Sequence, residues 1–194
     1  MIRALNSQVD NRKDEFEREA LPHLDALHRA AVCMTRNQQD AEDLVQETYM
    51  RAYRAFSTFN SGTNCRAWLF KILTNSNINR VRRASGIHEK LNFESVKGFM
   101  PATDESKEVP GSDAIGSLGE VVDEEVKQAL EQVPENFRMP LVLSAVEGLR
   151  YNEIARILDC PIGTVMSRIY RGRQMLRKKL REYAQTQGYR VATA

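Results

Sequence analysis

Apolar and polar positions alternate along most of the chain with the spacing of an α-helix. The clearest case is the segment 39–56, in which inward positions recur every three or four residues: Ala41, Leu44, Val45, Thr48, Tyr49, Ala52, Tyr53 and Phe56. Asp40, Glu42 and Asp43 lie in its first turn, where carboxylates interact favourably with the helix dipole. The pattern predicts an amphipathic helix with an acidic face in solvent.

The same spacing predicts helices before and after this segment, at 16–34 and 66–83. Asn60 to Asn64 forms a loop of turn-forming residues between the second and third helices. Four shorter helices fit the C-terminal part, at 122–132, 135–147, 151–158 and 162–183. Pro134 suits a first turn, whereas Pro140 removes a backbone donor, so we expect a kink or a later helix start there. The predicted fold class is all-α.

Residues 86–119 have a different character, because they are rich in Gly, Ser, Pro and acidic residues and show no helical periodicity. Such a composition predicts a flexible acidic linker. We therefore expect two small helical domains, at 1–85 and 123–194, joined by a linker at 86–122. With so few apolar anchors between them, the domains are expected to move independently in the free protein.

The formal net charge of +2 conceals a strong separation of charge along the chain. Residues 14–47 hold nine acidic and three basic residues, whereas 64–83 hold five basic residues and no acidic one. Residues 149–183 hold nine basic and three acidic residues. Two separate basic segments suggest two nucleic-acid contacts, although solvated helix faces fit the charges equally well.

The C-terminal end has the pattern of a helix-turn-helix. Ile154, Ala155 and Leu158 form the inward face of a short first helix, and Pro161 opens the second helix, whose inward stripe is Val165, Ile169, Leu176 and Leu180. Its outward face carries Thr164, Ser167, Arg168 and Arg171, and Met166 is also at an outward position. Arg173 is better assigned to a phosphate contact or to solvated charge. A short scaffold helix, a tight turn and an exposed face of donors suit a reader of the DNA major groove. The alternative is an amphipathic helix pair with an ordinary basic face.

Other classes of function find little support in the sequence. The three cysteines, Cys33, Cys65 and Cys160, lie far apart and match no metal-binding spacing, so we expect reduced thiols. No apolar run approaches the ~20 residues that span a bilayer, and the start lacks a signal-peptide core, which predicts a cytoplasmic protein without membrane insertion. No paired carboxylates, Ser/His/Asp set or P-loop appears, so neither an enzyme nor a bound cofactor is expected.

Three stretches carry a specific family resemblance. DAEDLVQETYMRAYRAFSTF at 40–59 and NCRAWLFKILTNSNINRVRR at 64–83 resemble region 2 of the sigma-70 family of bacterial transcription initiation factors. EGLRYNEIARILDCPIGTVMSRIYRGRQMLRKKL at 147–180 resembles region 4. Their order and spacing resemble the extracytoplasmic-function (group IV) class, which keeps only these two domains. The strings NCRAWLFKILTN and PIGTVMSR resemble members that answer redox or disulfide stress.

The resemblance implies three partners. The first is core RNA polymerase, contacted at the clamp helices of its largest subunit and at its flap. The other two are promoter DNA and an anti-sigma factor. Polymerase binding would fall to Asp40, Glu42, Asp43, Gln46 and Glu47. Contact with the −10 element would fall to Asn60, Ser61, Thr63, Asn64, Asn75, Asn79, Arg80, Arg82 and Arg83. The −35 element would be read by Thr164, Met166, Ser167, Arg168, Arg171 and Arg173.

A stand-alone helix-turn-helix regulator remains the alternative, because such proteins share the C-terminal motif. The acidic helix and the tryptophan-containing helix argue against it. Trp68 lies among Leu69, Ile72 and Leu73, so we expect it in the core rather than in contact with DNA.

Overall fold

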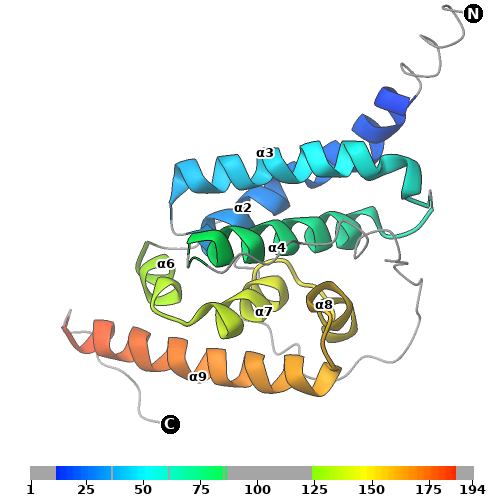
Figure 1. Cartoon of the computed structure of the whole chain (residues 1–194). Helices are drawn as coiled ribbons and strands as arrows, with labels where there is room; N and C mark the ends of the chain where they lie inside the picture. The colour runs from blue at the N-terminus through cyan, green and yellow to red at the C-terminus, as the bar shows by residue number, and fades with distance from the viewer. Residues whose placement is uncertain (1–11, 36, 61, 85, 87–123, 187–194) are drawn as a thin grey trace, which may run out of the picture.

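The computed structural model describes residues 12–35, 37–60, 62–84, 86 and 124–186, and within these ranges the chain is helical with no strand (Figure 1). A helical segment at 12–20 and the 3-10 turn η1 (Leu21–His23) precede the first long helices. These are α2 (Leu24–Thr35), α3 (Gln38–Ala55) and α4 (Cys65–Ala84), with the 3-10 turn η2 (Phe56–Thr58) after α3. The C-terminal part holds α6 (Glu124–Glu131), α7 (Glu135–Ala145), α8 (Tyr151–Leu158) and α9 (Ile162–Thr186). The all-α prediction is confirmed.

The helix predicted over 16–34 is divided in two, which corrects the sequence interpretation. Pro22 lies in η1, between the helical residues 12–20 and α2. A proline has no backbone N–H and therefore interrupts the regular hydrogen bonding of an α-helix. Pro140, in contrast, lies inside α7, which begins at the predicted residue, Glu135, and continues past the proline. The predicted linker lies outside the described residues, apart from Gly86.

Aromatic side chains form the centre of the N-terminal unit, which comprises the helical residues 12–20, α2, α3 and α4. The rings of Phe59 and Trp68 lie 4.8 Å apart, and Phe56 lies 5.2 Å from Phe16. Trp68 is 1% exposed, which confirms its predicted place in the core. The hydroxyl of Tyr49 donates to the backbone oxygen of Ala20 at 2.8 Å and ties α3 to the N-terminal helical segment.

The C-terminal unit, α6 to α9, packs around Leu141, Ile154, Ile157, Val165 and Ile169, each at most 2% exposed. Gly148 has a φ of +63° in the turn between α7 and α8, a backbone conformation that glycine adopts without strain. Asp159 adopts a left-handed conformation at the end of α8, where the chain turns into α9. The predicted helix-turn-helix is therefore formed by α8 and α9.

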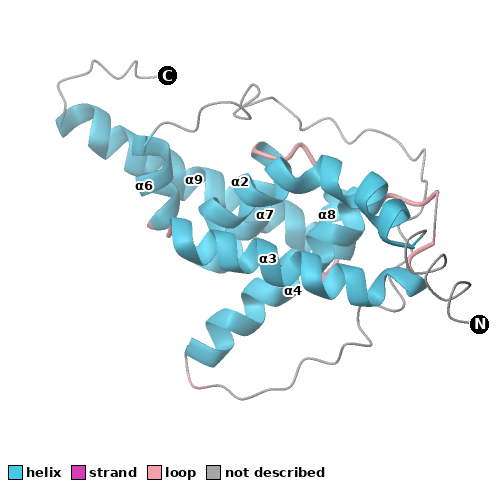
Figure 2. Cartoon of the chain, turned by 90° about the horizontal axis from the view of Figure 1, so that it is seen from above, coloured by secondary structure: helices cyan, strands magenta, loops and turns pink. Residues whose placement is uncertain are grey.

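The two units pack against each other, contrary to the expectation of independent domains. Helix α4 contacts α8, and α2 contacts α6 and α7 (Figures 1 and 2). Lys71, 6% exposed, donates to the backbone oxygens of Arg156 and Ile157, and Arg138, 4% exposed, donates to that of Met34. These contacts link polar side chains to backbone carbonyls, so they leave no trace in the apolar periodicity.

Candidate nucleic-acid interface

A tight turn leads into α4 and carries most of the short polar residues assigned to the −10 element. Gly62 has a φ of +91°, and the backbone N–H and hydroxyl of Thr63 both donate to the carbonyl of Asn60. Asn60 and Asn64 are exposed, whereas Ser61 lies outside the described residues. The turn therefore presents the amide of Asn60 to solvent shortly before α4 begins.

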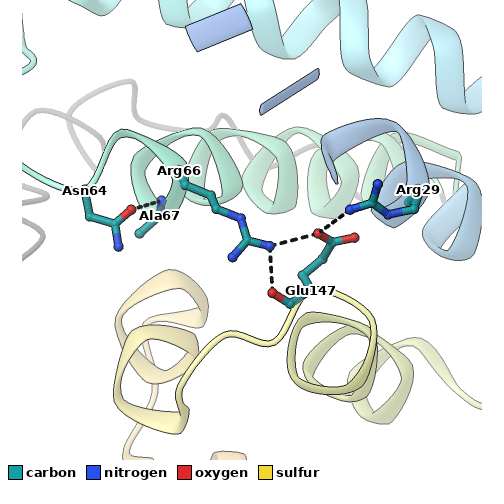
Figure 3. Close-up of polar contacts among 5 residues, drawn as sticks. All are labelled: Arg29, Asn64, Arg66, Ala67 and Glu147. Carbon is teal, nitrogen blue, oxygen red and sulfur yellow. Dashed lines mark hydrogen bonds and ion pairs between the residues drawn. The ribbon is translucent and has the colours of Figure 1, made fainter. Parts of the chain in front are cut away.

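Asn64 has a second, structural role at this position. Its Oδ1 accepts from the backbone N–H of Ala67 at 3.0 Å, so the side chain caps the first turn of α4 (Figure 3). Its Nδ2 donates to Oε1 of Glu153 on α8 at 3.0 Å. Both functional groups of the amide are thus engaged within the chain.

The remaining −10 candidates differ in their accessibility along α4. Arg82 and Arg83 are exposed and Asn75 is half-buried. Asn79 is only 5% exposed, and its amide makes no hydrogen bond within the described ranges. Arg80 pairs with the carboxylate of Asp40 and donates to its backbone oxygen at 2.8 Å. Asn79 is therefore inaccessible from solvent, whereas Arg82 and Arg83 are accessible.

The acidic face of α3 lies largely in solvent. Glu42, Asp43 and Gln46 are exposed, and Glu42 accepts from Gln38 at 3.0 Å. Glu47 is half-buried and pairs with Arg51, one turn further along α3. Asn37 caps the helix, since its Oδ1 accepts from the backbone N–H of Gln39 at 2.9 Å. Of the five residues assigned to this face, three are therefore exposed, while Asp40 and Glu47 are half-buried and paired with arginines.

Helix α9 presents the candidates for the −35 element. Met166, Ser167 and Arg171 are exposed, while Thr164, Arg168 and Arg173 are half-buried. The guanidinium of Arg168 lies 4.0 Å from the sulfur of Cys160, and the hydroxyl of Ser167 donates to the carbonyl of Thr164. Of the three arginines assigned to the −35 element, Arg171 is the most accessible.

Sequence reasoning missed an exposed apolar stripe on the same helix. Ile162 is 41%, Met166 is 40% and Tyr170 is 65% exposed, at intervals of four residues. The sequence signal was a second row of apolar residues on this helix, separate from the inward row that contains Val165 and Ile169.

Burial shifts the pKa of two ionisable side chains in the N-terminal unit, Cys65 and Lys71. Burial raises the pKa of the Cys65 thiol to about 12. Burial also lowers the pKa of Lys71, an effect that Asp159 and Cys160 oppose. Cys65 is therefore a protonated thiol at neutral pH, and Lys71 serves as a donor to the last carbonyls of α8.

The described residues hold no disulfide and no candidate metal site. Cys33, Cys65 and Cys160 are free cysteines. Among the described residues, no group of three His, Cys, Asp or Glu side chains is placed to hold a metal ion. None of the helices described combines the length and the apolar character needed to cross a lipid bilayer.

Comparison with known protein families identifies both units. Residues 21–87 match the family model of Sigma-70 region 2, and residues 123–176 match that of Sigma-70, region 4. The ECF RNA polymerase sigma factor SigW of Bacillus subtilis is 34% identical over 162 residues, which cover 81% of this chain and 84% of that protein. SigE of Mycolicibacterium smegmatis is 38% identical over 88% of this chain, but the match spans only 62% of that relative.

Solved structures give the same result. The chain is similar to the sigma factor RpoE of Bartonella quintana, solved with the anti-sigma factor NepR, with a TM-score of 0.65 and 29% identity. This match covers 86% of the chain and 97% of RpoE. CnrH, solved with the cytosolic domain of CnrY, shares the fold with a TM-score of 0.59 and 24% identity, over 88% of this chain and 90% of CnrH.

The fold and its two matched regions define a transcription initiation factor rather than an enzyme. The chain belongs to the extracytoplasmic-function RNA polymerase sigma factors.

Proposed function

We propose that this sigma factor binds core RNA polymerase through the acidic face of α3 and directs it to promoters through α4 and α9. The observation that carries the proposal is the presence, in one chain, of region 2 with an exposed acidic strip and region 4 with an exposed basic helix. The proposed division is a domain at 1–85, a linker at 86–122 and a domain at 123–194.

The polymerase-binding surface consists of Asp40, Glu42, Asp43, Gln46 and Glu47, and it faces the clamp helices of the largest subunit. Three of these residues are exposed on α3, and together they form a strip off its buried side. An acidic strip attracts a basic partner surface over about a Debye length, which favours rapid and salt-sensitive docking. Region 4 contacts the flap of the same enzyme.

Promoter contact is divided between the two units. The turn before α4 captures a base of the −10 element with its short amide and hydroxyl groups, and Arg82 and Arg83 bind the backbone. Support comes from the exposure of Asn60, Arg82 and Arg83 at the two ends of one helix. A flipped base exposes the edge that such groups recognise.

The −35 element is read by α9, whose first turns enter the major groove. Arg171 contacts a base edge, while Ser167 and Met166 lie on the same outward side. The exposed Lys178 and Arg177 lie further along the helix, where backbone phosphates are the nearer ligand.

An anti-sigma factor holds the protein inactive until a stimulus arrives. The similarity to RpoE, which was solved with such an inhibitor, supports this regulation. The resemblance of NCRAWLFKILTN and PIGTVMSR to redox-responsive members supports a thiol-oxidative stimulus in the cytoplasm. Cys33 and Cys65 are buried and therefore shielded from oxidants, whereas Cys160 is half-buried.

The experiment that tests the function is transcription of genomic DNA by core polymerase with and without this chain, with the 5′ ends of the transcripts sequenced. We expect a small set of start sites that share −35 and −10 elements and that vanish without the chain. Identical start sites in both reactions would contradict the proposal.

A further inference from the structure

A single buried carboxylate joins the two units near the start of α4. Glu147 lies in the turn between α7 and α8, and its side chain is 0% exposed. Its Oε2 accepts from Arg66 of α4 at 3.0 Å and from Arg29 of α2 at 3.4 Å (Figure 3). Arg66 also donates to the backbone oxygen of Glu147 at 2.6 Å. Two arginines of the N-terminal unit therefore converge on one oxygen of the C-terminal unit.

This contact lies beside the turn proposed to capture the −10 base. Arg66 follows Asn64 by two residues, and Asn64 itself donates to Glu153 of α8. The turn after α7 and the first residues of α8 thus cover the N-terminal end of α4. DNA bound along that end would have to displace both acidic side chains.

The two arginines have the properties of an anion site. Their side chains are 39% and 31% exposed, so both remain within reach of solvent at their edges. The positive charge of Arg66 adds to burial in lowering the pKa of His23. Burial raises the pKa of Glu147, while the charges and hydrogen bonds of Arg29 and Arg66 oppose that rise. The carboxylate is held in a poorly solvated place by these two guanidinium groups.

The site is not fully satisfied by the carboxylate. The buried Nε of Arg29 and Oε1 of Glu147 have no hydrogen-bond partner in the described part of the chain. A backbone phosphodiester carries one negative charge on two non-bridging oxygens, as a carboxylate does, and it suits the forked guanidinium geometry equally well. A phosphate at this position would also have the Nε–H of Arg29, which Glu147 leaves unused, as a donor.

We propose that Arg29 and Arg66 form a binding site for one phosphate of the promoter backbone at the −10 element, and that Glu147 occupies this site in the closed chain. The proposal rests on the function proposed above. When the two units separate on core polymerase, the arginines lose their carboxylate and take up the phosphate in its place. Closure of the chain and contact with this phosphate are then mutually exclusive.

The test uses holoenzyme and promoter duplexes in which one phosphate at a time, across the −10 element, is replaced by an uncharged methylphosphonate. We expect one position at which the replacement weakens binding by wild-type holoenzyme but not by Arg66→Ala or Arg29→Ala holoenzyme. Each variant should also lower the slope of log K against log salt by about one. Arg18→Ala, an exposed arginine on the N-terminal helical segment, is the matched control and should behave as wild type.

The phosphate site would be overturned if, at every position, the loss of affinity from the methylphosphonate simply added to the loss from the arginine variant. If the variant holoenzymes also begin transcription at the wild-type start sites with wild-type affinity, the site falls while the proposed function stands. If wild-type chain directs no initiation at all, the proposed function itself fails. Circular dichroism of each variant checks its fold, and Arg29→Ala serves if Arg66→Ala does not fold.

A second measurement tests the occupancy by Glu147 in the free chain. Glu147→Gln keeps the shape of the side chain but removes the charge that the arginines bind. Small-angle X-ray scattering should show a larger radius of gyration for this variant than for wild type, with an unchanged helical spectrum. An unchanged radius would show that Glu147 does not hold the units together.

Discussion

Gly172 of α9 packs directly against the backbone of Phe137 on α7. A Cβ added at this glycine would lie only 3.1 Å from the Phe137 carbonyl oxygen. The same Cβ would lie 3.5 Å from Leu141, also on α7. The helix proposed to read the −35 element is thus held against α7 by a close backbone approach at a residue without a side chain.

We predict that Gly172→Val lowers the free energy of unfolding by about 1–3 kcal/mol, because the added atoms force the two helices apart. Gly163→Val is the matched control, since no atom lies within 4 Å of a Cβ at that position of α9. Urea denaturation followed by circular dichroism measures both. Equal stability of the two variants would show that α7 and α9 adjust without cost.

A second prediction concerns the acidic strip of α3. Asp43→Lys should weaken binding to core polymerase at least tenfold, because it reverses an exposed charge in the centre of the strip, and the loss should shrink at high salt. Glu17→Lys, an exposed reversal on the N-terminal helical segment, should bind normally. Fluorescence anisotropy of labelled chain titrated with core polymerase measures both, and equal affinities would place the docking surface elsewhere.

The helical pattern located most elements, because amphipathic helices record their buried side in sequence. Helix α8 begins and ends at the predicted residues, and α3 differs by one residue at each end. The packing of the two units, in contrast, could not be predicted from the apolar pattern of the sequence. Lys71, Arg138 and Glu147 look like surface residues in the sequence, yet each is buried in a contact between the units.

A third prediction separates base reading from backbone contact on α9. Arg171→Ala should cost about 1–3 kcal/mol of binding on promoters with an intact −35 element and much less on scrambled ones. Lys178→Ala should weaken both templates alike and reduce the salt dependence. Transcription from matched templates across a salt series measures these effects. Equal losses on the two templates for Arg171→Ala would assign this arginine to the backbone.

The fourth prediction follows from the thiol of Cys65, which is 5% exposed and whose pKa burial raises from 9.0 to about 12. In the native protein at pH 8, iodoacetamide should modify the half-buried Cys160 first and leave Cys65 intact. Because the folded protein keeps this thiol protonated up to a higher pH than the unfolded chain does, the stabilising contribution is fully present below the unfolded pKa of 9.0. This contribution is lost as pH rises through 9 toward 12, so stability should fall over that window. Modification of Cys65 in folded protein, detected by peptide mass spectrometry, would contradict the assignment.

The sequence predicted the exposure of some candidate site residues well and of others poorly. The acidic strip and the helix-turn-helix follow from residue type and periodicity, so most of their members lie at or near the surface. Asn79 and Arg80 show the limit of that reasoning. Neighbours on one helix, they point to different surroundings, since Asn79 is buried and Arg80 pairs with Asp40. Only the packing of α3 on α4 decides this.

The most direct test of the central claim, that this chain reads promoters as part of the polymerase, is the affinity of a labelled promoter duplex for three samples. These are the chain alone, core polymerase alone and their mixture, measured by fluorescence anisotropy against a duplex with both elements scrambled. We predict that only the mixture discriminates between the two duplexes. Equal discrimination by the chain alone would contradict this account and identify a stand-alone helix-turn-helix regulator.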